Sequence, residues 1–268
     1  MKVTTILLIL LHTIMIQAEP YIVAHRGASG DAPENTLPAF RLAWEQHADA
    51  IEGDFHFTKD QKIICIHDKD TKKVAGVRHM VKDLNLQQLR KLDLGRGMFG
   101  KNGKGIHLPT FSEVLEVVPE GKKFFVEVKS DAALVPTMLR EIQASGLKDE
   151  QITVISFNED VIKAVKEQAP RFKAMWLSGL KKDRDGLMEP SIETVLKTLK
   201  EIKADGFSSK GVSFLDGNYI NAIKSKGYQY HVWTIDDAAE ARRFADLGVD
   251  SITTNYPAKI REALKASR

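Results

Sequence analysis

Residues 50–66 read AIEGDFHFTKDQKIICI, and this stretch decides how the strands of the chain are arranged. A strand pattern begins at Ala50, and a second apolar run, 63–66, follows after only residues 58–62. A parallel crossover needs about a dozen residues or more. The two runs must therefore pair as an antiparallel hairpin, and the second run cannot be a strand of a parallel barrel.

Short strand patterns alternate with helical patterns over the rest of the chain, which predicts parallel βα units. Strands are expected at 21–24, 50–55, 123–128, 151–155, 173–177, 206–208, 229–233 and 251–254, and helices at 37–46, 158–169, 191–203, 218–226 and 237–247. With the hairpin run set aside, eight strands remain. Their number and the chain length predict an α/β fold of the (β/α)8 TIM-barrel type, which typically has about 250 residues. An open doubly wound sheet is the alternative, but no Gly-rich phosphate loop lies where that fold needs one.

The composition excludes several classes of protein. The 268 residues are 43% hydrophobic and 28% charged, with a net charge of +3, which excludes a disordered chain. No basic stripe indicates a nucleic-acid partner. The single cysteine, Cys65, cannot close an internal disulfide, and no Cys/His cluster has zinc spacing.

Residues 1–18 predict a secretory signal peptide. Lys2 gives a positive start, an apolar run extends to Ile16, and Ala18 is a small residue at the expected cleavage point. The apolar run is shorter than the roughly 20 residues that span a bilayer. We therefore expect a barrel domain of residues 19–268 in an exported protein, periplasmic or secreted, with no stable membrane span after cleavage.

Residues 69–109 interrupt the βα alternation as an insertion after the hairpin of the second strand. An insertion of this length above a barrel is more often a lid or a recognition element than filler. Its basic residues favour either anionic head groups or a solvated face, and the sequence leaves both open: Lys69, Lys72, Lys73, Arg78, Lys101 and Lys104.

Acidic residues recur on one face of two predicted strands. Glu52 and Asp54 are two positions apart, so both side chains point to the same side, and Glu127 and Lys129 repeat this spacing. In a barrel this side faces the axis, and at the C-terminal ends of the strands it faces the active site. Buried carboxylates need partners. A hard cation with oxygen ligands and basic side chains both qualify.

Two histidines follow strand-forming runs. His25 comes directly after 22–24, and His67 comes after 63–66. Because histidine titrates near pH 6.5, such a pair can act as general acid and general base. His56 shares the face of the acidic pair and His231 lies within a strand, but for these and the remaining histidines a surface or core role is expected.

An ordered series of motifs resembles the glycerophosphodiester phosphodiesterase family over essentially the whole chain after the signal. The series consists of Ile22-Val23-Ala24-His25-Arg26-Gly27, Ala32-Pro33-Glu34-Asn35-Thr36, Ile51-Glu52-Gly53-Asp54, Ile66-His67-Asp68, Val126-Glu127-Val128-Lys129, Val232-Trp233-Thr234 and Asp250 to Pro257. Each motif alone is weak, but the ordered set is highly specific.

The resemblance implies a metal-dependent TIM barrel that hydrolyses glycerophosphodiesters to glycerol 3-phosphate and an alcohol. It implies one divalent cation, Ca²⁺ or Mg²⁺, held by Glu52, Asp54 and Glu127. It implies His25 and His67 as the acid–base pair, without saying which of them starts as the base. The partner is then a small-molecule phosphodiester, and the oligomeric state stays open.

The resemblance further implies that Arg26 and Lys129 contact the phosphate and that Trp233 forms a wall of the substrate pocket. Structural roles compete with these assignments. Arg26 can pair with a neighbouring carboxylate, Lys129 can pair with Glu127, and Trp233 can be plain core. The motif 34–36 is expected to cap the first helix.

Three other functions fit part of the sequence. A lysophospholipase D or sphingomyelinase D-like enzyme acting on lysophospholipids would use apolar residues of the insertion such as Met98 and Phe99. A glycoside-cleaving barrel would use Glu52 and Glu127 as its carboxylate pair, but it leaves both predicted catalytic histidines unused. A noncatalytic binding barrel would be expected to lack one of these groups, and none is missing.

Two positions depart from the family pattern. Ile235-Asp236 follows the Trp-Thr pair where many members have Asn, and Asn255 ends the last strand where Asp is commoner. Both positions are expected at the rim of the barrel. We expect them to affect recognition of the alcohol head group and to make no contact with the metal or the histidine pair.

Overall fold

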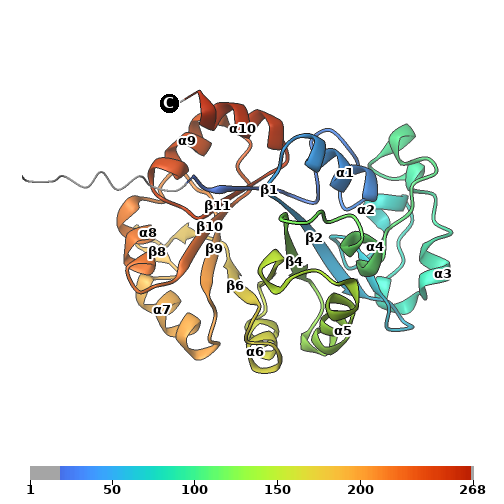
Figure 1. Ribbon diagram of the computed structural model, residues 1–268, viewed down its shortest axis with the longest axis horizontal. Coiled ribbons are helices and arrows are strands. Elements are labelled where there is room, and N and C mark those ends of the chain that lie inside the picture. The colour runs from blue at the N-terminus through green and yellow to red at the C-terminus, as the bar shows by residue number, and fades with distance from the viewer. Residues whose placement is uncertain (1–18, 267–268) are drawn as a thin grey trace, which may run out of the picture.

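The computed structural model describes residues 19–266, in which eight parallel strands close into a barrel (Figure 1). These strands are β1 (Tyr21–Ala24), β2 (Ala50–Phe57), β4 (Lys123–Val128), β5 (Ile152–Ser156), β6 (Lys173–Ser178), β9 (Gly206–Lys210), β10 (Gln229–Trp233) and β11 (Ser251–Thr254). β1 pairs with β11 on one side and with β2 on the other, which closes the barrel. The predicted (β/α)8 fold is confirmed, and the open sheet is wrong.

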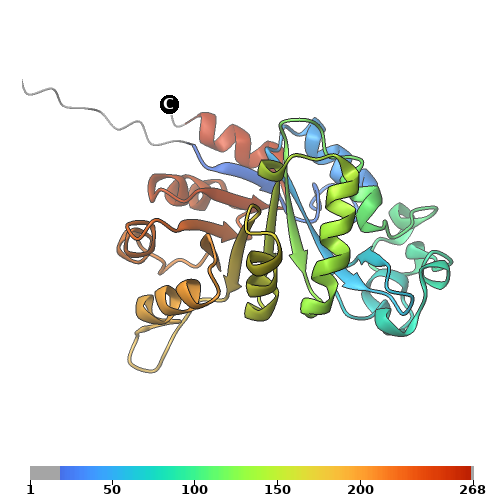
Figure 2. The same ribbon diagram turned by 60° about the horizontal axis from the view of Figure 1, so that its bottom comes forward.

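Helices follow the barrel strands and cover the outside of the sheet (Figures 1 and 2). They are α1 (Leu37–Glu45), α4 (Phe111–Leu115), α5 (Val135–Ser145), α6 (Glu159–Gln168), α7 (Ile192–Glu201), α8 (Gly217–Lys224), α9 (Ala238–Asp246) and α10 (Pro257–Lys265). Asn158 and Ser191 cap α6 and α7, because each side chain accepts a backbone N–H of the first turn. The sequence did not predict α4, α5 or α10.

The predicted hairpin is confirmed. β3 (Ile63–Cys65) runs antiparallel to β2, with Phe57 opposite Ile63. The hydroxyl of Thr58 accepts the backbone N–H of Lys62 and donates to Asp60, which fixes the turn. A second, shorter hairpin precedes α7 and consists of β7 (Lys181–Lys182) and β8 (Met188–Glu189). The sequence did not predict it.

Residues 69–109 form a separate layer beside β2 and β3 (Figures 1 and 2). This insertion consists of short helices: α2 (Lys72–Ala75), α3 (Leu86–Leu89) and 3-10 turns at Val81–Asp83, Leu94–Arg96 and Gly100–Gly103. It packs around an apolar cluster of its own that includes Val74, Val81, Leu89, Leu94 and Leu108. The insertion therefore has its own small core against the hairpin.

An apolar layer fills the lower part of the barrel and leaves its mouth polar. Val23, Ala50, Phe125, Ile155 and Leu177 belong to this layer. Side chains alternate along a strand, so the next inward-facing positions of β1, β2 and β4 are His25, Glu52 and Glu127. The layer thus supports a polar site at the C-terminal ends of the strands, where TIM-barrel active sites lie.

Within residues 19–266, no helix is both long enough and apolar enough to cross a lipid bilayer. The signal peptide predicted for residues 1–18 lies outside the described residues.

Candidate active site

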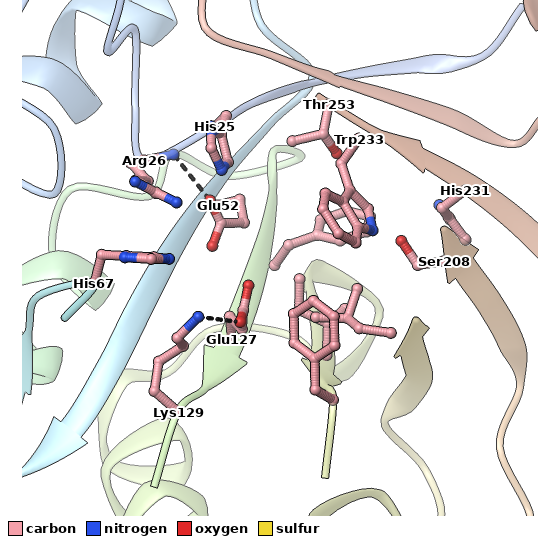
Figure 3. A pocket seen from close by; sticks show the side chains of 14 residues that line it. His25, Arg26, Glu52, His67, Glu127, Lys129, Ser208, His231, Trp233 and Thr253 are labelled. Atoms are coloured by element: carbon pink, nitrogen blue, oxygen red, sulfur yellow. Dashed lines mark hydrogen bonds and ion pairs between the residues drawn. The ribbon is translucent and has the colours of Figure 1, made fainter. Parts of the chain in front are cut away.

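A cavity of about 540 Å³ lies at the C-terminal ends of the barrel strands (Figure 3). Seven of the eight predicted site residues line it: His25, Arg26, Glu52, His67, Glu127, Lys129 and Trp233. The eighth, Asp54, lies beneath the cavity with 1% of its surface exposed. The structure therefore brings together all the groups that the sequence placed at strand ends.

Three carboxylates form a buried cluster that fits a divalent cation. One oxygen each from Glu52, Asp54 and Glu127 lies within 4.8 Å of the others. Glu52 Oε1 and Asp54 Oδ1 are buried and have no hydrogen-bond partner among the described residues. Carboxylate oxygens at this spacing, without hydrogen bonds of their own, are the ligands that a hard cation prefers. The residues present thus fit a divalent metal ion.

The negative charges of the three carboxylates repel one another, and together with burial this repulsion raises the pKa values of two of them. Burial, together with the charges of Asp54 and Glu127, raises the pKa of Glu52 well above its ordinary value. Burial and the charge of Asp54 raise the pKa of Glu127 to about 7. Without a cation the cluster therefore holds its negative charge at a cost in free energy.

Asp54 differs from its neighbours because cations surround it. Burial alone would raise its pKa, but Arg26, Lys129 and His67 outweigh burial and lower it. Arg26 Nε lies 3.1 Å from Asp54 Oδ2, and Lys129 Nζ lies 3.6 Å from Asp54 Oδ1. The amide of Asn35 donates to the same carboxylate at 2.8 Å. Asp54 is the carboxylate that stays ionised.

Arg26 and Lys129 form ion pairs with carboxylates, which is the structural role that the sequence offered as the alternative to phosphate contact. Arg26 Nη1 lies 3.1 Å from Glu34, and Lys129 Nζ lies 2.7 Å from Glu127. Both cations also line the cavity, where 14% and 18% of their side-chain surfaces are exposed. Each therefore pairs with carboxylates while keeping access to a bound anion.

The motif 34–36 does more than cap the first helix. Only Thr36 caps α1, by accepting the backbone N–H of Ala39. Glu34 accepts hydrogen bonds from Arg26 and from Lys73 of the insertion, at 3.1 and 2.7 Å. An ion-pair chain thus connects the insertion with Asp54 through Glu34 and Arg26.

His25 is held by a hydrogen bond between Nδ1 and Asn255 Oδ1, 2.8 Å long. The hydroxyl of Ser29 donates to the same oxygen, and Asn255 Nδ2 donates to Asp236 Oδ2 at 2.6 Å. The oxygen of Asn255 therefore faces the imidazole, so Nδ1 carries the hydrogen and Nε2 is left as an acceptor. Burial and the charge of Arg26 lower the pKa of His25 to about 4. The ring is neutral at physiological pH.

The expectation that neither departing position contacts the histidine pair is wrong. Asn255 contacts His25 directly, and Asp236 accepts two hydrogen bonds from Asn255, one from its backbone N–H and one from its amide. The reason is barrel closure: Ala24 at the end of β1 is in register with Thr254 at the end of β11. The residues that follow these two strands must therefore lie side by side.

His67 reaches the cavity from the hairpin and not from a barrel strand. Its Nδ1 lies 2.7 Å from the carboxylate of the next residue, Asp68. His56 Nε2 donates to the backbone carbonyl of His67 at 3.2 Å. Asp68 therefore orients the ring and His56 steadies the backbone, two roles that the sequence did not predict.

The wall on the side of the cavity away from His67 is uncharged. It contains Trp233 together with Ser208, His231 and Thr253 (Figure 3). His231 was expected at the surface or in the core, and its place in the cavity wall was missed. One signal could have found it: His231 lies two residues before Trp233 on the same strand, so both must face the same side.

A barrel whose mouth holds two histidines, three clustered carboxylates and two cations has the architecture of a phosphodiester-cleaving enzyme. The sequence model of the Glycerophosphoryl diester phosphodiesterase family matches residues 25–259, and the chain belongs to this family.

Individual relatives agree with this assignment. The chain is 32% identical to the glycerophosphodiester phosphodiesterase of Caldanaerobacter subterraneus subsp. tengcongensis, over 88% of this chain and 94% of that protein. It is 26% identical to the lysophospholipase D GDPD1 of Mus musculus, over 90% and 85% of the two chains. A phosphodiesterase of Oleispira antarctica, solved in complex with the product sn-glycerol-3-phosphate, shares the fold with a TM-score of 0.80, 23% identity and coverage of 92% and 97%.

Proposed function

We propose that the protein hydrolyses glycerophosphodiesters to glycerol 3-phosphate and an alcohol in a reaction that depends on a divalent cation. One observation carries the proposal. His25 and His67 each have Nδ1 engaged by a neighbouring residue, and both line a cavity that also holds the carboxylate cluster and two cations. Family membership supports the substrate class.

Glu52, Asp54 and Glu127 would hold the cation, Ca²⁺ or Mg²⁺, because both are hard ions that take oxygen ligands. When bound, the cation neutralises charge that develops on the nonbridging phosphate oxygens. Arg26 and Lys129 contribute to the same stabilisation as fixed positive charges at the cavity wall.

The two histidines have different surroundings and therefore different roles. His25 is neutral because its pKa is lowered to about 4, and its Nε2 has a free lone pair, so it is the initial base. The carboxylate of Asp68 orients the ring of His67 through Nδ1, and because His25 is the base, His67 is left as the initial acid.

In the proposed reaction, His25 Nε2 takes the proton of the glycerol hydroxyl next to the phosphoester. That oxygen bonds to phosphorus as the bond to the alcohol breaks, and His67 gives its proton to the leaving oxygen. Water then opens the cyclic phosphate with the roles reversed: His67 takes a proton from water, and His25 returns its proton to the glycerol oxygen. Both histidines end in their starting states.

We also propose that residues 1–18 are a cleaved signal peptide and that the barrel acts in the periplasm or outside the cell. The apolar run and the small residue Ala18 support this. Mass spectrometry of the exported protein should find Glu19 at its N-terminus. A chain that retains Met1 and stays with the cytosolic fraction would contradict the proposal.

The catalytic proposal is tested by product release from glycerophosphocholine and glycerophosphoethanolamine, with and without a chelator. The variants are His25→Ala and, as a matched control, His79→Ala, which replaces an exposed histidine of the insertion. We expect the chelator and His25→Ala to abolish release and the control to retain it. Release that survives both the chelator and His25→Ala would refute the proposed site.

A further inference from the structure

The catalytic cavity has a closed, uncharged end. Ser208, His231 and Thr253 lie on the neighbouring strands β9, β10 and β11, and only 5%, 4% and 7% of their surfaces are exposed. At the rim, by contrast, Phe157 is 49% exposed and its ring meets Trp233 edge to face at 5.6 Å. Figure 3 shows Ser208, His231 and Thr253 on the side away from His67 and Arg26.

Two polar atoms at this end have no partner among the described residues. His231 Nδ1 is hydrogen-bonded to the hydroxyl of Ser251, but its Nε2 is buried and unpaired. Trp233 Nε1 is also buried and unpaired. Buried polar atoms in native proteins nearly always have a hydrogen-bond partner, because leaving one unpaired is costly. Both residues line the cavity, so a hydroxyl group of a ligand can supply the missing partner.

The chemistry of this wall selects an uncharged hydroxyl. Burial lowers the pKa of His231 to about 4, so the ring is neutral at physiological pH. Ser208, Trp233 and Thr253 bring no charge, so the fixed positive charges that match a phosphate lie on the other side of the cavity, at Arg26 and Lys129. The ring of Phe125 packs edge-on against His231 at 5.7 Å and offers an apolar surface to carbon atoms. Hydroxyl partners beside an aromatic face suit a small polyol.

We infer that the closed end binds the terminal hydroxymethyl group of the substrate's glycerol moiety, with His231 and Ser208 as residues that determine specificity. This inference rests on the proposed function, since the charged side of the cavity must hold the phosphate. The alcohol head group then points towards the open rim near Phe157.

A free terminal hydroxyl becomes a condition for good substrates. An acyl chain on that oxygen would have to pass through the closed end, where Leu177 is also only 2% exposed. It would also leave His231 and Trp233 without partners. The enzyme should therefore prefer glycerophosphodiesters over lysophospholipids.

The test compares two choline esters, glycerophosphocholine and 2-hydroxyethyl phosphocholine. The second keeps the hydroxyl next to the phosphoester but lacks the terminal hydroxymethyl group. We expect the wild type to have a kcat/KM about 100-fold higher for the glycerol ester, because the shorter ester leaves buried polar groups unpaired. In His231→Phe the ratio should fall to below about tenfold, through loss of activity on the glycerol ester alone.

Two further variants keep the test decisive. Tyr230 precedes His231 on β10, so its side chain points to the opposite face of that strand, where its hydroxyl pairs with Ser209 of β9. Tyr230→Phe removes this hydroxyl and should leave the ratio unchanged. If His231→Phe does not fold, Ser208→Ala decides, with an expected fall in the ratio of about fivefold. Lysophosphatidylcholine serves as a third substrate and should be cleaved at least about 100-fold less efficiently than glycerophosphocholine.

Three results would overturn the inference. The first is a wild type that cleaves the two choline esters equally well. The second is a folded His231→Phe or Ser208→Ala with the wild-type ratio, and the third is efficient cleavage of lysophosphatidylcholine. A wild type that cleaves none of the three substrates refutes the proposed function, and the inference falls with it.

Discussion

Removing the cation should make the stability of this enzyme depend on pH in a direction set by Glu127. Its carboxyl has an ordinary pKa of 4.5, which burial and Asp54 raise to about 7 in the folded protein. A group with a raised folded pKa binds its proton more tightly in the folded state than in the unfolded state. Its stabilising contribution is therefore complete below about pH 4.5 and is lost as the pH rises through about 7.

The size of the effect follows from the same values. One pKa unit corresponds to 1.36 kcal/mol, so the metal-free protein should lose about 3 kcal/mol of unfolding free energy between pH 4.5 and pH 8 because of Glu127. Glu52 adds to the loss, because its pKa is raised too. A bound divalent cation removes the repulsion that raises both values, so saturating Ca²⁺ or Mg²⁺ should flatten the dependence.

Urea unfolding at pH 5.5 and pH 8, with chelator and with added cation, measures this loss. In Glu127→Gln without cation, the difference between the two pH values should shrink by about 2 kcal/mol or more, because the neutral amide cannot ionise. Glu120→Gln, which changes a carboxylate that is 84% exposed on its side chain, serves as the matched control and should leave the difference unchanged. Equal pH dependence in Glu127→Gln and wild type would refute the reasoning.

Further predictions concern four single residues. Asp68→Asn should lower kcat about tenfold or more, and His67→Gln should lower it about 10²- to 10⁴-fold. Both variants should keep the thermal stability of the wild type. If Asp68→Asn is as active as the wild type, Asp68 does not orient His67. Asn255→Asp should move the acidic limb of the kcat/KM–pH profile to higher pH by about one unit. The reason is that a carboxylate beside Nδ1 raises the pKa of His25 from its value of about 4. An acidic limb at the wild-type pH would count against His25 as the base. Phe124→Ala should cost about 3–5 kcal/mol of unfolding free energy in a urea titration, since the ring is fully buried and packs against two other phenylalanines.

The barrel itself could be predicted because its evidence is local. Residues 58–62 are too short for a crossover, and this removed one strand candidate and left eight. Strand alternation likewise placed Glu52 and Asp54 on one face, which the cluster geometry bears out. Local signals failed in residues 69–109, where four-residue helices and 3-10 turns carry too little periodicity to be distinguished from loops.

The contacts that orient the catalytic candidates could not be predicted, because they join distant parts of the chain. His25 and Asn255 are 230 positions apart and meet only because the last strand pairs with the first. Lys73 reaches Glu34 only because the insertion folds back onto the β1–α1 loop. Spacing rules describe one strand at a time. They therefore gave the residues at the strand ends but not their hydrogen-bond partners.

Charge balance explains why the site combines so many ionisable groups. Ion pairs of 2.7–3.6 Å join three carboxylates, Glu34, Asp54 and Glu127, with three cations, Arg26, Lys73 and Lys129. Glu52 is the fourth carboxylate of the network and accepts the backbone N–H of Arg26 at 2.9 Å. Full ionisation would give this network one net negative charge, and without a cation that charge is resisted by the raised pKa values of Glu52 and Glu127. Bound cation changes the net charge to one positive, and a monoanionic phosphodiester then neutralises it. Since unbalanced charge is costly in a largely buried site, the network favours binding of the cation before the substrate.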